Sequence, residues 1–165
     1  MIPILSIVGY SDSGKTTYLE RLIPELVKRG IRITVVKHDV HGFEIDKPGK
    51  DSYRLKQAGA MTSIISSPEK IAVIADTDHD LTLSEIRDRF GFDADLILSE
   101  GYKNDVHPKI EVFRKGRHES LLCSNDDSLF AVAADTDLPP LPVPVIPLDD
   151  PARMAQLIME TILGR

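Results

Sequence analysis

The octet Gly9–Thr16, with the sequence GYSDSGKT, constrains the fold of this chain more than any other stretch. It matches the P-loop pattern G-x-x-x-x-G-K-[ST], in which glycines let the backbone curl around phosphate oxygens while consecutive amides point inward. An apolar, β-branched run over Ile2–Val8 precedes it, and large aliphatic residues follow at helical spacing from Leu19 until Gly30. A strand, a phosphate loop and a helix therefore stand in the order that such a site requires.

Two side chains of the octet have defined roles in a loop of this kind. Lys15 would reach the β- and γ-phosphates, and the Thr16 hydroxyl would hold Mg²⁺. The positive end of the following helix dipole would point at the same phosphates. The alternative is a glycine-rich turn that binds no ligand. The flanking strand and helix instead favour a loop that binds a nucleoside triphosphate with Mg²⁺.

Chain length, composition and net charge limit the classes of protein to which this chain could belong. The chain has 165 residues, of which 42% are hydrophobic, and this predicts one domain over residues 1–165. The net charge of −6, without a basic block, argues against broad binding to nucleic acid or to an anionic membrane. Cys123 is the only cysteine, which excludes an intramolecular disulfide and a cysteine-rich zinc site, and a reducing compartment is expected.

The N-terminal apolar run is short, has no basic flank before it and leads directly into the P-loop, unlike a signal peptide. No apolar run approaches the roughly 20 residues of a membrane span. We therefore expect a soluble, cytoplasmic protein.

A second apolar run, Ile31–Val36, ends in the polar loop Lys37–Gly42. Ligands of open α/β sheets lie beyond the carboxyl ends of the strands, so this loop comes beside the P-loop if the two strands share a sheet. Lys37, His38 and His41 are therefore candidate site residues. The histidines could bind phosphate, relay a proton or ligate a metal, and a solvated loop histidine is the alternative at each position.

The middle of the chain departs from strict alternation of strands and helices. Asp51 or Ser52 can cap a short helix through Ala58. Two short apolar runs, Thr62–Ser66 and Ile71–Ala75, then flank a turn and predict a hairpin. An antiparallel addition to the parallel sheet is the simplest explanation.

The run from Asp95 to Gly101, DLILSEG, predicts a buried strand that ends in an acid and a glycine. Glu100 stands where a nucleotide-binding sheet needs a carboxylate for Mg²⁺ or for water, and a solvent-exposed loop acid is the alternative. Before it, Thr82 and Glu85 have the spacing of a capping box, so a helix should precede this strand.

Apolar and charged residues alternate over Ile110–Phe113, as they would in a half-exposed strand, and such a strand could pair with a second copy at an edge. The basic turn Arg114–Arg117 follows, either as a phosphate contact or as a solvated hairpin tip. Cys123 stands beside two leucines, which is typical of a small core residue.

Leu129–Ala134 predicts a further strand, and Asp135 and Asp137 follow its end. Carboxylates in this position could accept hydrogen bonds from the guanine N1 and N2 donors, although the full N-K-x-D guanine pattern is absent. The prolines of residues 138–147 preclude a helix and form either a stiff connector or a docking ligand. Asp150 is expected to cap the final helix.

These elements predict an α/β fold with a mainly parallel sheet of about five to seven strands and helices on both faces. It would be a P-loop NTPase fold with an added antiparallel strand or hairpin. Such a fold hosts kinases, hydrolases and switches, so function has to be inferred from the site.

Five segments occur together in a distinctive order: the P-loop with Gly9, Gly14, Lys15 and Thr16; Lys37-His38-x-x-His41-Gly42; Asp51-Ser52; Gly59-Ala60; and Leu98-Ser99-Glu100-Gly101-Tyr102-Lys103. In this combination the chain resembles the MobB proteins of molybdenum cofactor biosynthesis, from about Ile4 to the terminal helix. Many unrelated proteins share a P-loop, so the K-H-x-x-H-G loop and the S-E-G-Y-K segment are the specific part of the resemblance.

The resemblance implies a dimeric, GTP-binding accessory protein that assists molybdopterin guanylyltransferase, the enzyme that attaches GMP to molybdopterin. It implies at most weak GTPase activity, with Lys15 and Glu100 as catalytic residues and with Mg²⁺ at Thr16 and Glu100. Lys37, His38 and His41 would line the site. The phosphate ligands that it implies are Gly9, Ser13, Gly14, Lys15, Thr16 and Thr17. A preference for GTP over ATP rests on the resemblance alone, and molybdopterin itself is a further candidate ligand.

Two other functions fit the same residues. A small-molecule kinase would use Glu100 or His41 as the base, and a GTPase metallochaperone would hold a metal through His38, His41 and His107. An arginine-rich lid of the kind that screens phosphates in compact kinases is not evident. No arginine lies in any loop expected near the γ-phosphate, which agrees with low turnover unless a partner supplies one.

Overall fold

Hydrogen bonds between parallel strands organise the larger part of the chain. The computed structural model describes residues 1–165, and they divide into two units, residues 1–38 with 82–165, and residues 39–81. One domain over residues 1–165 therefore stays a prediction.

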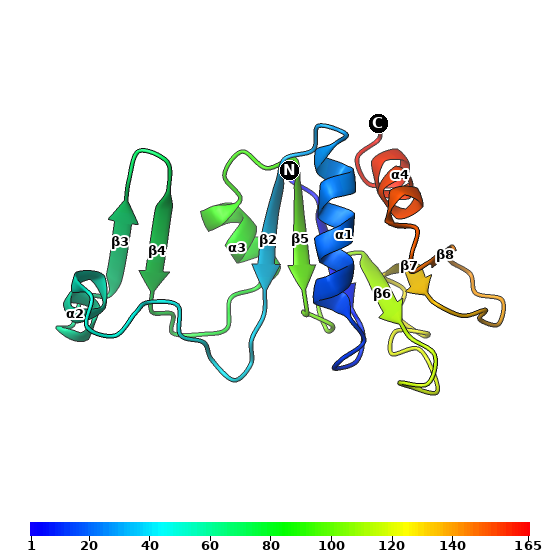
Figure 1. The fold of residues 1–165 in the computed structure, drawn as a ribbon, viewed down its shortest axis with the longest axis horizontal. Helices are drawn as coiled ribbons and strands as arrows, with labels where there is room; N and C mark the ends of the chain where they lie inside the picture. The colour runs from blue at the N-terminus through cyan, green and yellow to red at the C-terminus, as the bar shows by residue number, and fades with distance from the viewer. The chain divides into compact units, whose positions relative to one another are not determined.

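The sheet of the larger unit has the strand order β2-β5-β1-β6-β7-β8, and every neighbouring pair is parallel. This confirms the predicted mainly parallel sheet (Figure 1). Because β1 is an interior strand, the loops that follow β5, β1 and β6 leave the same edge side by side. The strands are β1 (Ile4–Val8), β2 (Ile33–Lys37), β5 (Leu96–Glu100), β6 (Lys109–Phe113), β7 (Leu129–Ala134) and β8 (Val145–Pro147).

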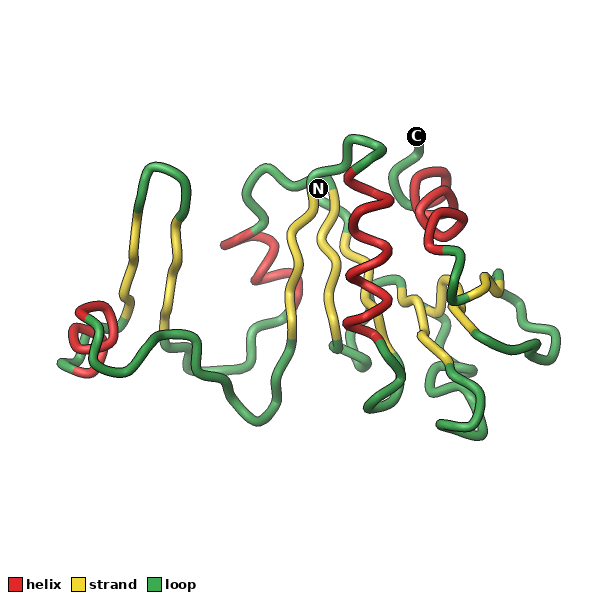
Figure 2. Tube along the Cα trace, viewed as in Figure 1, coloured by secondary structure: helices red, strands yellow, loops and turns green.

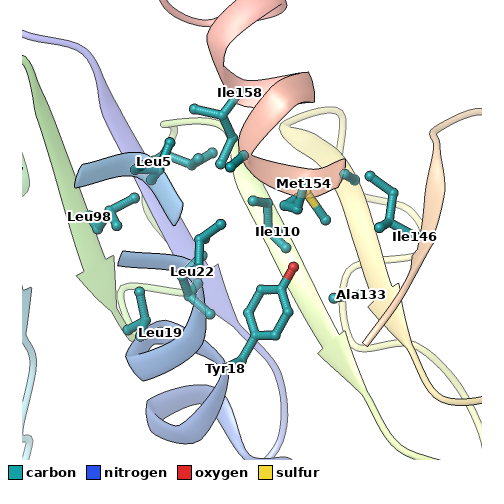
Figure 3. Close-up of a cluster of buried hydrophobic side chains, with 14 of the residues drawn as sticks. Leu5, Tyr18, Leu19, Leu22, Leu98, Ile110, Ala133, Ile146, Met154 and Ile158 are labelled. Atoms are coloured by element: carbon teal, nitrogen blue, oxygen red, sulfur yellow. The ribbon is translucent and has the colours of Figure 1, made fainter. Parts of the chain in front are cut away.

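Helices α1 (Lys15–Val27) and α4 (Pro151–Thr161) cover one face of this sheet. Their buried side chains meet those of the strands in the main core, where Leu22 and Met154 are fully buried (Figure 3). Helix α3 (Leu83–Phe90) packs on the opposite face, where its Leu83 contacts side chains of β1 and β5. The prediction of helices on both faces is confirmed.

The predicted caps of two helices are present. Thr82 and Glu85 form a reciprocal capping box at the start of α3. The Asp150 side chain accepts a hydrogen bond from the Arg153 amide at the start of α4, and Pro151 occupies the first helical turn. The longest helix, α1, has 13 residues, and none of the helices is both long and apolar enough to cross a membrane.

The prediction that the strand over Ile110–Phe113 is half-exposed is wrong. β6 is buried along its whole length and lies between β1 and β7, so it offers no free edge for pairing with a second copy. The alternation of apolar and charged residues misled the prediction because both charged side chains, Lys109 and Glu111, are buried with hydrogen-bond partners.

These two side chains each hold a loop. The Lys109 ammonium donates to the Asp105 carbonyl, the Asp126 carboxylate and the Ser128 hydroxyl. The Glu111 carboxylate accepts from the backbone amides of Leu122 and Cys123, at 2.6 and 2.9 Å. Burial raises the pKa of Glu111, and the two amide hydrogen bonds oppose that rise. Buried charges are tolerated here because each has partners.

The unit of residues 39–81 contains helix α2 (Asp51–Gln57) and the antiparallel strands β3 (Thr62–Ser66) and β4 (Ile71–Ala75). The hairpin is confirmed (Figure 2), but its predicted addition to the parallel sheet is wrong. β3 and β4 pair only with each other, in a separate two-stranded sheet. A pattern of apolar residues specifies a strand, but it does not specify which strand it pairs with.

We predict that Asp126 contributes to the acid limit of stability. Hydrogen bonds from Ser128 and Lys109 lower the pKa of Asp126 to about 2. Its contribution is therefore present above the unfolded-state pKa near 3.8 and is lost as the pH falls through about 2. Asp126→Asn should lower the free energy of unfolding at pH 7 by about 1 kcal/mol, since the carboxylate is partly exposed. The difference from the wild type should shrink between pH 4 and pH 2.

Urea unfolding at a series of pH values measures this difference, and Asp127→Asn, at the exposed neighbouring position, is the matched control. A constant difference between the Asp126 variant and the wild type from pH 7 to pH 2 would contradict the assignment.

Candidate functional site

The predicted P-loop joins the end of β1 to the start of α1. Gly9, Asp12 and Gly14 have positive φ angles of 141°, 60° and 88°, and these residues curl the backbone. A Cβ atom on Gly9 would lie 2.7 Å from the Val112 carbonyl oxygen and 2.9 Å from the Ser13 Oγ. The first glycine of the motif is therefore required both by its backbone conformation and by the approach of β6.

The loop leaves donors available for an anion. Gly14 is the N-cap residue of helix α1 and offers no side-chain cap, so the amides of the first turn have no side-chain acceptor. The Ser13 hydroxyl is buried and has no hydrogen-bond partner in the protein. An unpartnered buried hydroxyl beside an uncapped helix N-terminus fits a phosphate group.

The Lys15 side chain folds back over the loop that precedes it. Its Nζ donates to the carbonyl oxygens of Gly9 at 3.2 Å and Tyr10 at 2.7 Å. Burial lowers the pKa of Lys15, and the nearby Glu100 carboxylate opposes that shift. The ammonium group thus occupies the mouth of the P-loop.

Glu100 and Thr16 come together although 84 positions separate them in the sequence. The Thr16 hydroxyl donates to the Glu100 carboxylate, with both oxygens at 2.8 Å, and Lys37 Nζ lies 4.0 Å from Glu100 Oε1. β5 delivers Glu100 and β2 delivers Lys37 to the edge where β1 ends. A hydroxyl and a carboxylate beside a phosphate loop are the oxygen ligands that Mg²⁺ takes together with phosphates.

The two histidines of the second loop belong to different units. His38 stacks on Tyr102 with ring centroids 4.4 Å apart, and its amide donates to the Glu100 carbonyl at 3.0 Å. His41 lies in the unit of residues 39–81, where its amide donates to the Asp39 carboxylate at 3.0 Å. The predicted position of His41 beside the P-loop stays a prediction.

Asp135 and Asp137 follow β7 and line an open pocket of about 820 Å³. Asp135 Oδ1 accepts a hydrogen bond from the Lys115 amide at 2.8 Å, so part of this carboxylate is engaged in holding the preceding turn. The other pocket walls come from the α1 side chain Arg21, from Arg114, and from the segments 134–138 and 145–149. The pocket is large enough for a nucleoside.

Arg114 lies against the P-loop, although no arginine was expected in a loop near the γ-phosphate. Its Nε donates to the Ser13 carbonyl at 3.0 Å, directly on the P-loop. The turn that it begins connects the parallel strands β6 and β7, so it is not a hairpin tip. The sequence contained one signal for this contact, because Arg114 immediately follows a strand. Without knowledge that β6 lies beside β1, that signal could not be used.

A stacking contact between the P-loop residue Tyr10 and His118 was also missed. Tyr10 and His118 stack with ring centroids 4.0 Å apart, and His118 Nε2 lies 3.4 Å from the Ser11 carbonyl oxygen. Thus the segment after β6 contacts the P-loop at two places, through Arg114 and through His118.

Comparison with known proteins identifies the family. Residues 4–135 match the family model of molybdopterin guanine dinucleotide synthesis protein B, MobB. The chain belongs to the MobB family.

Curated relatives of the family align with most of the chain. A molybdopterin-guanine dinucleotide biosynthesis adapter protein of Haemophilus influenzae is 42% identical over 83% of this chain and 77% of its own length. The protein of the same description from Escherichia coli is 40% identical over 97% of this chain and 93% of its own length.

A solved MobB structure has the same fold. A crystal structure of molybdopterin-guanine biosynthesis protein B superposes with a TM-score of 0.74 at 30% identity, and covers 98% of this chain and 99% of that one. This confirms the predicted resemblance and the P-loop fold. As for metal binding, no group of three or more His, Cys, Asp or Glu side chains is arranged to hold an ion in this MobB chain.

We predict that Gly9 tolerates alanine far less well than a glycine in open space does. Gly9→Ala should lower the free energy of unfolding by about 2 to 4 kcal/mol, because backbone strain and the clash with the Val112 carbonyl add together. Gly116 is the matched control, with a φ of 77° and no atom within 4 Å of the position that a Cβ would take. Its alanine variant should lose only about 1 kcal/mol.

Urea unfolding midpoints measure both effects. Equal losses at the two glycines would show that the approach of β6 does not constrain the P-loop.

Proposed function

We propose that this chain is a GTP-binding adaptor that, with Mg²⁺, assists the nucleotidyltransferase that converts molybdopterin to molybdopterin-guanine dinucleotide. The observation that carries the proposal is the P-loop with its Thr16–Glu100 pair, in a chain that belongs to the MobB family. The relatives described as adapter proteins of this biosynthesis support the role.

Phosphate binding is assigned to Gly9, Ser13, Gly14, Lys15, Thr16 and Thr17. The buried, unpartnered Ser13 hydroxyl and the uncapped start of α1 support this assignment. Lys15 would exchange the carbonyls of Gly9 and Tyr10 for phosphate oxygens, which are stronger acceptors because they are charged.

Mg²⁺ would be held by Thr16 and Glu100. The 2.8 Å hydrogen bond between them supports this assignment, because it brings a hydroxyl oxygen and a carboxylate to one point beside the P-loop. The ion would neutralise charge on the phosphates when bound. Lys37 and His38 would line the same edge of the sheet.

We assign the guanine base of the bound GTP to the pocket after β7. Asp137 is the better of the two candidate acceptors for guanine, since Asp135 already accepts from the Lys115 amide. A carboxylate matches the adjacent N1 and N2 donors of guanine, whereas adenine has no such pair of donors.

We assign at most a weak GTPase activity, with Lys15 and Glu100 as the catalytic residues. Fast phosphoryl transfer needs a group that orients water and cations that stabilise the transition state. An adaptor needs only nucleotide binding and a partner surface, so low turnover is compatible with the role.

The proposed partners are molybdopterin guanylyltransferase, molybdopterin itself and a second copy of this chain. Exposed apolar side chains on the β3–β4 hairpin support a contact with a macromolecule, because soluble proteins seldom leave such a cluster in water. They are Ile64, Ile65, Ile71 and Val73. Sedimentation of the purified protein across a range of concentrations tests the homodimer.

We predict a GTP preference that depends on Lys15. Titration with GTP and ATP, each with Mg²⁺, should give at least tenfold tighter binding of GTP, which corresponds to about 1.4 kcal/mol. Lys15→Ala should abolish binding of both nucleotides. Lys28→Ala is the control, because Lys28 is an exposed lysine at the far end of the same helix.

Equal affinities, or a preference for ATP, would argue against the guanine assignment. Together with nucleotide consumption that accelerates when a small-molecule acceptor is added, such a result would favour the kinase.

The adaptor role predicts binding to the partner enzyme. Purified chain with GTP and Mg²⁺ should form a complex with purified molybdopterin guanylyltransferase in sedimentation velocity, and should raise the yield of guanine dinucleotide per unit time. Lys15→Ala should not raise that yield. The proposal is rejected if the chain binds neither nucleotide nor this enzyme, and stoichiometric metal binding through histidines would favour the metallochaperone instead.

A further inference from the structure

Arg114 lies at the junction between the phosphate loop and the pocket after β7. Its Nε donates to the Ser13 carbonyl at 3.0 Å. A Cβ built on Gly14 would lie 3.0 Å from Arg114 Nε and 3.2 Å from Nη2, so the guanidinium rests against the P-loop backbone. The position of this group is thus fixed by the loop that is assigned to the phosphates.

The same side chain lines the pocket of about 820 Å³ with Asp135 and Asp137. Among the residues that line this pocket, Arg114 is the one that makes a hydrogen bond to the P-loop. A nucleotide with its phosphates in the P-loop and its base in the pocket would extend past Arg114, because this residue borders both.

The guanidinium has capacity left for a ligand. Its hydrogen bond to Ser13 uses Nε, and neither terminal amino group has a hydrogen bond or an ion pair with the protein. The side chain is half-buried, so one part contacts protein and another is accessible. Arginine presents a planar cation that stacks on aromatic rings, and an arginine already fixed by one hydrogen bond loses less conformational entropy when it does so.

We propose that Arg114 is a nucleoside-contacting residue, whose guanidinium plane packs against the ribose and base of a nucleotide bound at the P-loop. The proposal rests on nucleotide binding as the proposed function. Stacking does not depend on the identity of the base, because every base has a π-face. Arg114 therefore contributes to the affinity for GTP and ATP alike, and discrimination between them falls to the carboxylates after β7.

The experiment compares three variants of the full chain with three ligands. Arg114→Ala and Arg114→Lys are the test variants, and Arg117→Ala is the matched control, because Arg117 is an exposed arginine in the same turn. The ligands are GTP, ATP and inorganic tripolyphosphate, each with Mg²⁺. Calorimetry gives the nucleotide affinities. The shift in unfolding midpoint with ligand concentration gives the affinity for tripolyphosphate, because this shift also registers weakly bound ligands.

Arg114→Ala should weaken the binding of GTP and of ATP about tenfold each and leave the ratio of the two affinities unchanged. It should alter the affinity for tripolyphosphate by less than twofold. Arg114→Lys keeps the charge and can still donate to the Ser13 carbonyl, but it has no planar face. It should therefore weaken both nucleotides by an intermediate factor. Arg117→Ala should match the wild type.

Three results would overturn the proposal. Equal losses for tripolyphosphate and the nucleotides would mean that Arg114 acts only by holding the P-loop. Unchanged nucleotide affinity in Arg114→Ala would mean that it makes no ligand contact. If Arg114→Ala destabilises the fold, the nucleotide affinity of Arg114→Lys decides whether the stacking contact exists. An affinity equal to that of the wild type in Arg114→Lys rejects it. A wild-type chain that binds no nucleotide would instead reject the proposed function.

Discussion

The close approach of the phosphate loop to β6 is the constraint on which the site depends. Gly9 lies so near the Val112 carbonyl that no side chain fits between them. This contact requires β6 to be the immediate neighbour of β1, which the parallel register provides. The order of the sheet therefore determines which residues surround the loop. β5 brings Glu100 to one side, and the segment after β6 brings Arg114 to the other.

The buried carboxylate of Glu111, next to Val112 on β6, holds the surroundings of this contact. Glu111 accepts the amides of Leu122 and Cys123, which fixes the middle of the long connection between β6 and β7. The same connection carries Arg114 and His118 to the P-loop. A neutral side chain at position 111 would leave the part-buried Leu122 amide and the buried Cys123 amide without a charged acceptor, and their desolvation would be costly. A single carboxylate on β6 therefore stabilises a loop that borders the candidate site.

The sequence was sufficient for those parts of the fold and site that depend on local pattern. The P-loop, the capping box at Thr82 and the acid at Glu100 all follow from residue type and spacing along one element. The interior position of β6, the separate hairpin sheet and the contact of Arg114 with Ser13 depend on which strands are neighbours. Strand order is set by long-range packing, and one sequence contains no direct record of it. For the same reason, a pattern that alternates charge and hydrophobicity could not reveal that the charged side chains are buried with hydrogen-bond partners.

The position of the Lys15 ammonium has a consequence for the shape of the loop. The carbonyl oxygens of Gly9 and Tyr10 attract positive charge, and Lys15 supplies that charge from within the chain. The lysine acts as an internal counterion that keeps the loop in its curled shape. The proposed ligand would compete for a single flexible side chain, because the loop is already curled. The proposed binding would replace one hydrogen-bond acceptor of Lys15 by another through the rotation of its side chain.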